Sequence, residues 1–276
     1  MKKATVSVII PTYNRAAWLP HAIDSVLQQD VPPAELIVVD DGSKDETPEV
    51  VRRYADVIYV QQEQKGPAAA RNTGVEIASG EWVAFLDSDD RWLPKKLLRQ
   101  LDFLHQNPDF RAVYTNERWI RNGTFVNQGK RHKKYGGEIY LHCLPLCIIS
   151  PSSILMHKPL FQELGGFDPD LPACEDYDLW LRLSAHHAVG FIDEALIEKY
   201  GGHEDQLSRQ WGLDVYRVIA LEKMLQQQDL RLDYRLATIA ELVRRCEILE
   251  IGFMKNGKTQ EAASYREKAR FWKQGA

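Results

Sequence analysis

Hydrophobic residues in the first half of the chain occur in two alternating patterns. Short, nearly continuous apolar runs have the length of buried strands, and they cover residues 6–10, 36–39, 57–60 and 82–86. Longer stretches repeat apolar residues at helical spacing, and they cover residues 16–29, 43–54, 67–78 and 94–106. Strands that alternate with helices predict a mostly parallel sheet with right-handed crossovers, and therefore an α/β fold.

The second half of the chain has a different pattern. Its predicted strands cover residues 112–119, 152–156 and 189–192, and a helix is predicted at 176–186. From about residue 212 the spacing is helical, with breaks near Asp229 and at Asn256 and Gly257. We therefore expect one α/β domain over residues 1–211 and a helical C-terminal region over residues 212–276.

Composition and charge restrict the class of protein. The 276 residues are 44% hydrophobic, which is enough for a globular core, and the net charge of −4 excludes a generally basic nucleic-acid-binding protein. Four cysteines without paired spacing indicate a reducing compartment. The apolar run at 6–10 is too short for a signal peptide or a membrane span, so we expect a cytoplasmic protein.

Acidic residues follow the fourth predicted strand. In parallel sheets ligands bind beyond the carboxyl ends of the strands, and Asp87, Asp89 and Asp90 occupy such an end, with Ser88 between them. Clustered carboxylates repel one another, and a divalent cation relieves that repulsion. Mg²⁺ and Mn²⁺ also favour phosphate oxygens, which makes a nucleotide diphosphate the expected companion. The alternative is that Asp89 or Asp90 caps the helix that follows.

Asp40 and Asp41 end the second predicted strand. Carboxylates at this position can accept hydrogen bonds from a base N–H or a ribose hydroxyl. The alternative is a turn and a helix cap, because Ser43 and Glu46 have the spacing of a capping box.

Two further segments carry charged groups at predicted helix starts. Arg71 lies in an alanine-rich stretch, where it can aim at phosphates or be an ordinary surface arginine. Glu175 and Asp176 precede an apolar helix, and a carboxylate there can act as a general base or simply favour the positive end of the helix dipole.

These segments together resemble the family 2 glycosyltransferases of the GT-A fold over roughly residues 4–211. The resemblance rests on motifs within residues 8–15, 39–43, 70–74, 85–90, 165–168 and 175–180. It implies a nucleoside-binding half over about residues 1–90 and an acceptor-binding half over 91–211. It also implies an inverting transfer of a sugar from a nucleotide diphosphate donor, such as a UDP-sugar, to a hydroxyl of a saccharide or lipid-linked saccharide in cell-surface polysaccharide synthesis.

The resemblance assigns roles to individual residues. The donor contacts are Pro11, Thr12, Tyr13, Arg15, Asp40, Asp41, Arg71, Asp87 and Ser88. A Mn²⁺ or Mg²⁺ ion is expected at Asp87, Asp89 and His203, and Asp176 is expected to be the catalytic base. The Gln-x-x-Arg-Trp motif of processive members does not occur around Trp211, so we expect one sugar to be transferred at a time.

Three other functions compete with this interpretation. A sugar nucleotidyltransferase needs a glycine-rich basic loop after the first strand, where this chain has Pro11, Thr12 and Tyr13. An NAD oxidoreductase needs Gly-x-Gly-x-x-Gly at that place. A nucleotide-sugar-binding module without activity would keep the fold and lose the chemistry, but every key acidic position is intact.

The last predicted helix has an apolar face with basic flanks. The face holds Ala262, Tyr265, Ala269 and Trp272, and the flanks hold Arg266, Lys268, Arg270 and Lys273. This face can pack on the chain's own catalytic domain, form a homodimer, or contact anionic lipid peripherally, together with the basic residues 131–134.

Overall fold

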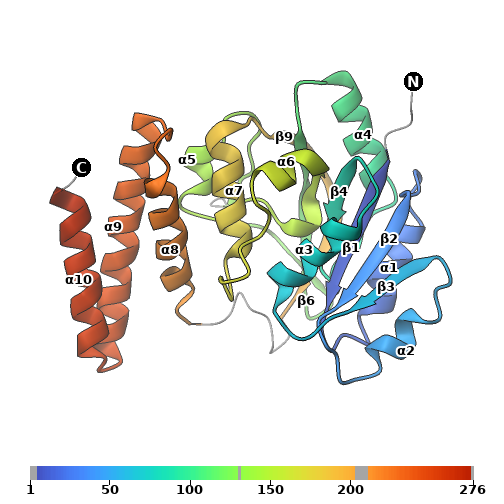
Figure 1. Cartoon of the computed structure of the whole chain (residues 1–276), viewed down its shortest axis with the longest axis horizontal. Helices are drawn as coiled ribbons and strands as arrows, with labels where there is room; N and C mark the ends of the chain where they lie inside the picture. The colour runs from blue at the N-terminus through green and yellow to red at the C-terminus, as the bar shows by residue number, and fades with distance from the viewer. Residues whose placement is uncertain (1–4, 130–131, 203–210, 275–276) are drawn as a thin grey trace.

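The computed structural model describes residues 5–129, 132–202 and 211–274. Within them, one nine-stranded sheet is flanked by helices, and three C-terminal helices lie at the far end of the molecule from the N-terminus (Figure 1). The strand order is β3-β2-β1-β4-β8-β6-β9-β5, and β7 pairs with β6. The expected α/β fold class is therefore confirmed.

The first half of the sheet is parallel. Its strands are β1 (Val6–Thr12), β2 (Glu35–Asp40), β3 (Val57–Gln61) and β4 (Trp82–Phe85). Ile9 of β1 pairs with Ile37 and with Phe85, so the carboxyl ends of β1, β2 and β4 lie beside one another. Both faces of β1 are covered, since Ile9 packs into one apolar cluster and Val8 and Ile10 pack into the other. Burial on both faces explains the nearly continuous apolar run.

The second half of the sheet is mixed. Its strands are β5 (Arg91–Trp92), β6 (Ala112–Arg121), β7 (Thr124–Val126), β8 (Ile154–His157) and β9 (Gly190–Gly201). β8 runs antiparallel to β4 and β6, whereas β9 is parallel to β6. β9 is three times longer than the predicted strand because its pairing with β6 continues through register shifts near Asn116, beyond the apolar run.

Helices cover the two faces of this sheet. The helices are α1 (Leu19–Leu27), α2 (Thr47–Val51), α3 (Pro67–Ile77), α4 (Lys96–Gln106), α5 (Tyr140–Cys143), α6 (Lys158–Glu163) and α7 (Glu175–His186). A 3-10 helix, η2 (Pro151–Ser153), leads into β8. α1 and α4 contribute Ile23 and Leu97 to one apolar cluster, whereas α3 and α7 contribute Val75 and Leu179 to the other.

The predicted capping box at Ser43 is wrong. α2 begins only at Thr47, whose N–H donates to Asp45 Oδ1 at 3.0 Å. Ser43 instead joins two loops, because its N–H donates to Asp40 Oδ1 at 2.8 Å and its hydroxyl accepts from Asn14 N at 2.8 Å. The loop contacts of Ser43 thus replace the helix start that its spacing to Glu46 predicts.

The C-terminal region consists of α8 (Leu213–Gln226), α9 (Leu232–Lys255) and α10 (Thr259–Gln274). The apolar face of α10 packs inside the chain, where Ala262 and Ala269 are buried and Tyr265 stacks on Phe253 of α9. The basic flank is largely paired, as Arg266, Lys268 and Lys273 lie 2.6–2.7 Å from Glu250, Glu222 and Glu247. The observed packing of this face is on α9 of the C-terminal region and not, as predicted, on the catalytic domain; homodimerisation and peripheral lipid contact stay predictions.

Among the helices that the structure describes, none combines the length and apolar character needed to cross a bilayer.

α9 docks on the α/β domain through α5. The rings of Tyr140 and Tyr234 stack with centroids 4.4 Å apart, and the Tyr140 hydroxyl lies 2.7 Å from Thr238 Oγ1. The Thr238 hydroxyl donates to Tyr234 O, so Tyr140 is the donor in this pair. Both side chains are completely buried, which makes the pair a direct link between the α/β domain and the C-terminal helices.

We expect Thr238→Val to lower the free energy of unfolding by about 1–3 kcal/mol, because it leaves the buried Tyr140 hydroxyl without an acceptor. Urea unfolding measures this change. The matched variant combines Thr238→Val with Tyr140→Phe and removes both polar groups, so it should regain much of the loss. A neutral Thr238→Val would contradict the docking.

Candidate functional site

A cavity of about 1010 Å³ lies at the carboxyl ends of β1, β2 and β4 and extends between the two halves of the sheet. It is lined by most of the residues predicted from the sequence, namely Pro11, Thr12, Tyr13, Arg15, Asp41, Arg71, Asp87, Ser88, Asp89 and Asp176. Asp40 is not among the lining residues. His203 lies outside the described residues.

Asp40 shapes the loop behind the cavity. It is completely buried, with Oδ2 accepting from the Tyr59 hydroxyl at 2.6 Å and Oδ1 accepting from Ser43 N at 2.8 Å. Asp41 lines the cavity but holds the next loop as well, since its oxygens accept from Lys65 N and Gly66 N at 2.8 and 2.7 Å. Asp40 and Asp41 therefore hold the loops that form the wall of the pocket. The local sequence cannot distinguish this structural role from direct contact with a nucleotide base.

The segment after β1 is arranged by contacts with the segment after β2. Asn14 has a left-handed backbone with φ of 51°, its N–H donates to Ser43 Oγ, and its side-chain oxygen accepts from Lys44 N. Arg15 N donates to Thr47 Oγ1 at 3.0 Å. Thr12 Oγ1 is buried without a hydrogen-bond partner in the described part of the chain. A buried orphan hydroxyl at a cavity wall is a group that a ligand can satisfy.

Asp90 is a structural residue rather than a ligand. It is 2% exposed, Oδ2 accepts from Ser152 Oγ at 2.7 Å, and Oδ1 accepts from Tyr200 N at 3.1 Å. Burial, reinforced by the charge of Asp89, raises the pKa of Asp90 well above its ordinary value. Asp90 thus joins the end of β4 to η2 and β9, which corrects the idea that it caps the following helix.

Asp87, Asp89 and Asp90 all line the cavity, but both oxygens of Asp90 accept hydrogen bonds from Ser152 and Tyr200, so Asp87 and Asp89 are the candidate ligands. No group of three His, Cys, Asp or Glu suited to a metal occurs in residues 5–129, 132–202 and 211–274. Mg²⁺ in nucleotide sites is commonly held by one or two carboxylates together with substrate phosphates and water. The two aspartates fit that donor set, provided that the nucleotide supplies the remaining oxygens.

Arg71 bridges the two acidic motifs. It is 5% exposed, and its Nη2 and Nη1 lie 2.7 Å from Asp87 Oδ1 and 2.8 Å from Glu175 Oε1. Burial acts to raise the pKa of Asp87, but the charges of Arg71 and Lys199 outweigh it and hold that pKa below its ordinary value. Arg71 is therefore not a surface residue. It lines the cavity, but its guanidinium is already ion-paired with two carboxylates and is not available to phosphate alone.

Asp176 lies in the first turn of α7, at the cavity. Its Oδ2 accepts from the Cys147 thiol at 3.3 Å, and its Oδ1 accepts from Tyr177 N at 2.7 Å. Cys174, directly before the helix, has a left-handed backbone with φ of 64°. Such backbones are uncommon for residues other than glycine and cluster at functional sites. The contacts from Cys147 and Tyr177 N orient the Asp176 carboxylate. The sequence analysis did not identify Cys147 as a residue of the site.

The floor of the cavity holds charged residues that sequence reasoning missed. Glu117 of β6 lies 3.3 Å from Lys134, whose ammonium also donates to Ile148 O at 2.8 Å. Lys199 of β9 donates to Ser150 Oγ at 3.1 Å. The sequence offered a signal for these residues, because a charged residue inside a strand is seldom buried unless it is paired.

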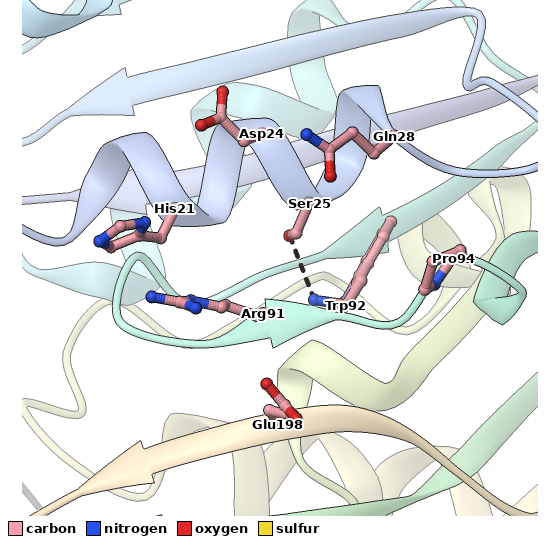
Figure 2. Close-up of a pocket in the computed structure, with 8 residues that line it drawn as sticks. All are labelled: His21, Asp24, Ser25, Gln28, Arg91, Trp92, Pro94 and Glu198. Carbon is pink, nitrogen blue, oxygen red and sulfur yellow. Dashed lines mark hydrogen bonds between the residues drawn. The ribbon is translucent and has the colours of Figure 1, made fainter. Parts of the chain in front are cut away.

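A second, smaller pocket of about 290 Å³ lies between α1 and the β5–β9 edge (Figure 2). Side chains of both charges line it, including Asp24, Arg91 and Glu198, and Trp92 N donates to Ser25 Oγ at 3.1 Å. None of the residues predicted from the sequence lines it. The larger cavity is therefore the candidate active site.

Comparison with known sequences shows the family. Residues 7–165 match the Glycosyl transferase family 2. The chain is 33% identical over 202 residues to an uncharacterized glycosyltransferase of Rickettsia bellii, covering 71% of this chain and 29% of the relative. It is 32% identical over 218 residues to Escherichia coli WfgD, named a UDP-Glc:alpha-D-GlcNAc-diphosphoundecaprenol beta-1,3-glucosyltransferase, covering 75% and 83%. The chain spans 29–63% of the length of the Rickettsia relatives.

Solved structures are similar in fold. S. aureus TarS 1–349 in complex with UDP-GlcNAc has a TM-score of 0.69 and 19% identity, covering 96% of this chain and 91% of that one. The mannosyltransferase PcManGT from Pyrobaculum calidifontis, in complex with GDP-Man and Mn²⁺, has a TM-score of 0.62 and 22% identity, covering 96% and 74%. The likeness confirms the expected GT-A fold.

Proposed function

The chain belongs to glycosyl transferase family 2, and we propose that it transfers a single sugar from a UDP-sugar to a hydroxyl of a lipid-linked saccharide, with inversion at the anomeric carbon. The observation that carries this proposal is the cavity itself. It brings Asp87 and Asp89, at the end of β4, into one pocket with Asp176 of α7. We assign residues 1–90 to donor binding and 91–211 to acceptor binding, because the cavity is lined from both segments.

Asp176 is the proposed general base. Its carboxylate removes the proton of the acceptor hydroxyl while that oxygen forms a bond to the anomeric carbon and the bond to the nucleoside diphosphate breaks. The proton ends on Asp176, and the bonding pair leaves with the diphosphate. One displacement inverts the configuration and needs no nucleophile from the enzyme. The hydrogen bonds from Cys147 and Tyr177 N support this role, since they hold the carboxylate in one orientation.

A divalent cation is part of the proposal. Asp89 and Asp87 would hold it, with His203 as a further proposed ligand, and it would neutralise charge on the diphosphate. Arg71 would add positive charge at the same end of the cavity while keeping Asp87 in place.

Basic side chains in the cavity support a phosphate-bearing acceptor. Arg121, His132 and Arg217 line the cavity, and such groups bind phosphate oxygens. The E. coli relative is named for a diphosphoundecaprenol-linked acceptor. We therefore propose a lipid-linked saccharide of polysaccharide biosynthesis, reached at the cytoplasmic face of the membrane.

Donor binding is expected to require Mn²⁺ or Mg²⁺. A thermal-shift screen of UDP, GDP, dTDP and CMP, with and without Mn²⁺, should show the largest rise in Tm for UDP with the metal. At a hundred times Kd, the rise should be about 5 °C or more. Asp89→Ala should abolish the part of the rise that depends on the metal and leave the fold intact.

The matched control for this experiment is Asp102→Ala, which removes an exposed carboxylate of α4. It should respond to UDP and Mn²⁺ like the parent chain. If Asp89→Ala responds like the control, the metal assignment is wrong. If the parent chain shows no nucleotide-sugar turnover but does bind UDP, a binding module replaces the enzyme as the better description.

A further inference from the structure

Lys199 is a charged residue at the cavity that the mechanism above does not use. It lies near the end of β9, and its ammonium donates to Ser150 Oγ at 3.1 Å. An ammonium carries three N–H donors, and this contact uses one of them. No carboxylate oxygen of the described residues lies within 4.0 Å of it as an ion pair, in contrast to Lys134, which pairs with Glu117 at 3.3 Å. Lys199 therefore keeps donor capacity for a ligand.

The surroundings of Lys199 place it between the two acidic motifs. Its neighbour Tyr200 is bonded through N–H to Asp90, and Ser150 directly precedes η2, whose Ser152 bonds to Asp87 N and to Asp90. Burial opposes the charge of Lys199, but the carboxylates of Glu117, Asp90, Asp87 and Asp176 outweigh it and raise the pKa of the ammonium above its ordinary value. Lys199 is thus charged at neutral pH, and it lines the cavity where carboxylates of both acidic motifs act on it.

The charge around Lys199 decides what kind of ligand group fits there. Four carboxylates act on it, so a phosphate or carboxylate of a ligand placed at the same point, away from the cation proposed at Asp87 and Asp89, would be repelled by them. A sugar hydroxyl is not repelled, because it can accept a hydrogen bond from the ammonium and donate one to a carboxylate. Glu117 offers such an acceptor, because its buried Oε2 is ion-paired with Lys134 at 3.3 Å but accepts no hydrogen bond in the described part of the chain.

From this arrangement we infer that Lys199 is a specificity-determining residue, whose ammonium binds a hydroxyl of the transferred sugar, and that this sugar is uncharged. The inference rests on the proposed function, since it assigns one contact of the same donor site. It separates two parts of the donor: the nucleoside diphosphate is bound by the β1, β2 and β4 ends, and the sugar by the β6–β9 floor. It also excludes acidic sugars such as uronic acids as preferred substrates.

The test compares Lys199→Met with the parent chain by calorimetric titration of UDP, UDP-glucose, UDP-N-acetylglucosamine and UDP-glucuronic acid in the presence of Mn²⁺. If the screen above selects another base, the corresponding nucleotides are used. Loss of a hydrogen bond from a charged donor should weaken binding of the preferred neutral sugar nucleotide about ten- to a hundredfold. Binding of UDP should stay within about twofold of the parent chain. The kcat/KM for transfer should fall at least as much as the affinity.

The matched control is Lys255→Met, which removes the same charge from the exposed end of α9 and should leave both affinities unchanged. Lys199→Arg keeps the charge and should retain part of the sugar affinity. If Lys199→Met does not fold, as judged by its Tm, Lys199→Gln is measured in its place.

Three results would overturn the inference. One is an equal loss of UDP and UDP-sugar affinity, which would place the ammonium on the diphosphate. The second is an unchanged ratio of the two affinities, and the third is tightest binding of UDP-glucuronic acid by the parent chain. All three leave the proposed function standing. The proposed function fails separately, if the parent chain neither binds a nucleotide nor turns over a nucleotide sugar.

Discussion

Asp176→Asn is expected to lower kcat for sugar transfer by about a thousandfold, within the 10²–10⁴ range typical of a general base. The change keeps the size of the side chain and removes the carboxylate oxygen that accepts the proton. The Kd for the UDP-sugar with Mn²⁺ should stay close to that of the parent chain, because the donor contacts lie on other elements. Steady-state kinetics and calorimetric titration measure the two quantities separately.

The control for this variant is Asp229→Asn, whose carboxylate is 77% exposed, and it should transfer at the parent rate. If Asp176→Asn retained a tenth of the activity, the base would lie elsewhere. The neighbouring carboxylates are poor substitutes. Glu175 is paired with Arg71 at 2.8 Å, and Asp178 is 1% exposed and lies 2.6 and 2.7 Å from Arg182 and Lys223.

Arg71→Met is expected to lower the free energy of unfolding by about 3–5 kcal/mol, because it leaves two largely buried carboxylates without their counter-ion. Both partners, Asp87 and Glu175, depend on the same guanidinium. The matched control is Arg111→Met. It breaks a surface pair with Glu163 and should cost no more than about 1 kcal/mol. Urea unfolding at pH 7 gives both values.

The cost of Arg71→Met should become smaller as the pH falls. Without the guanidinium, burial and mutual repulsion raise the folded-state pKa of Asp87 above the unfolded value, and they raise further the pKa of Glu175, which burial already raises in the parent chain. A raised pKa means that the folded state binds protons more tightly, so stability rises as the pH falls through that pKa. In the parent chain the contribution of Asp87 to stability decreases as the pH falls, because its folded-state pKa lies below the ordinary value. A deficit equal at pH 7 and pH 5.5 would show that lost packing, not charge, is the cause.

The sequence by itself determined the alternation of elements and the place of the acidic ends. Apolar runs and helical spacing depend on neighbours within about four residues, and they predicted β1 to β4, α3, α7 and the C-terminal helices within a few residues of their observed bounds. The parallel order of those strands then put residues 11–15, 41 and 87–90 at one edge of the sheet. An acidic cavity at this edge of the sheet was therefore predictable from the sequence.

Only the tertiary structure decided which of these residues have a structural role and which are candidate ligands. Asp87, Asp89 and Asp90 look alike in the sequence and all line the cavity, yet both oxygens of Asp90 accept hydrogen bonds from Ser152 and Tyr200, which ties it to η2 and β9. The same holds for Arg71, whose two carboxylate partners come from β4 and α7. Local pattern cannot report such pairs, because their partners are brought together by the path of the whole chain.

The same physical reason accounts for the elements that the sequence missed or misplaced. β9 extends beyond its apolar run because β6 supplies its hydrogen bonds, and Ser43 bonds to Asn14 across two loops instead of capping a helix. Lys199 and Cys147 reach the cavity from segments without any motif. Burial and hydrogen bonding in these places depend on residues far apart in the chain, so hydrophobic periodicity predicts the elements, and the packing of those elements decides which side chains meet.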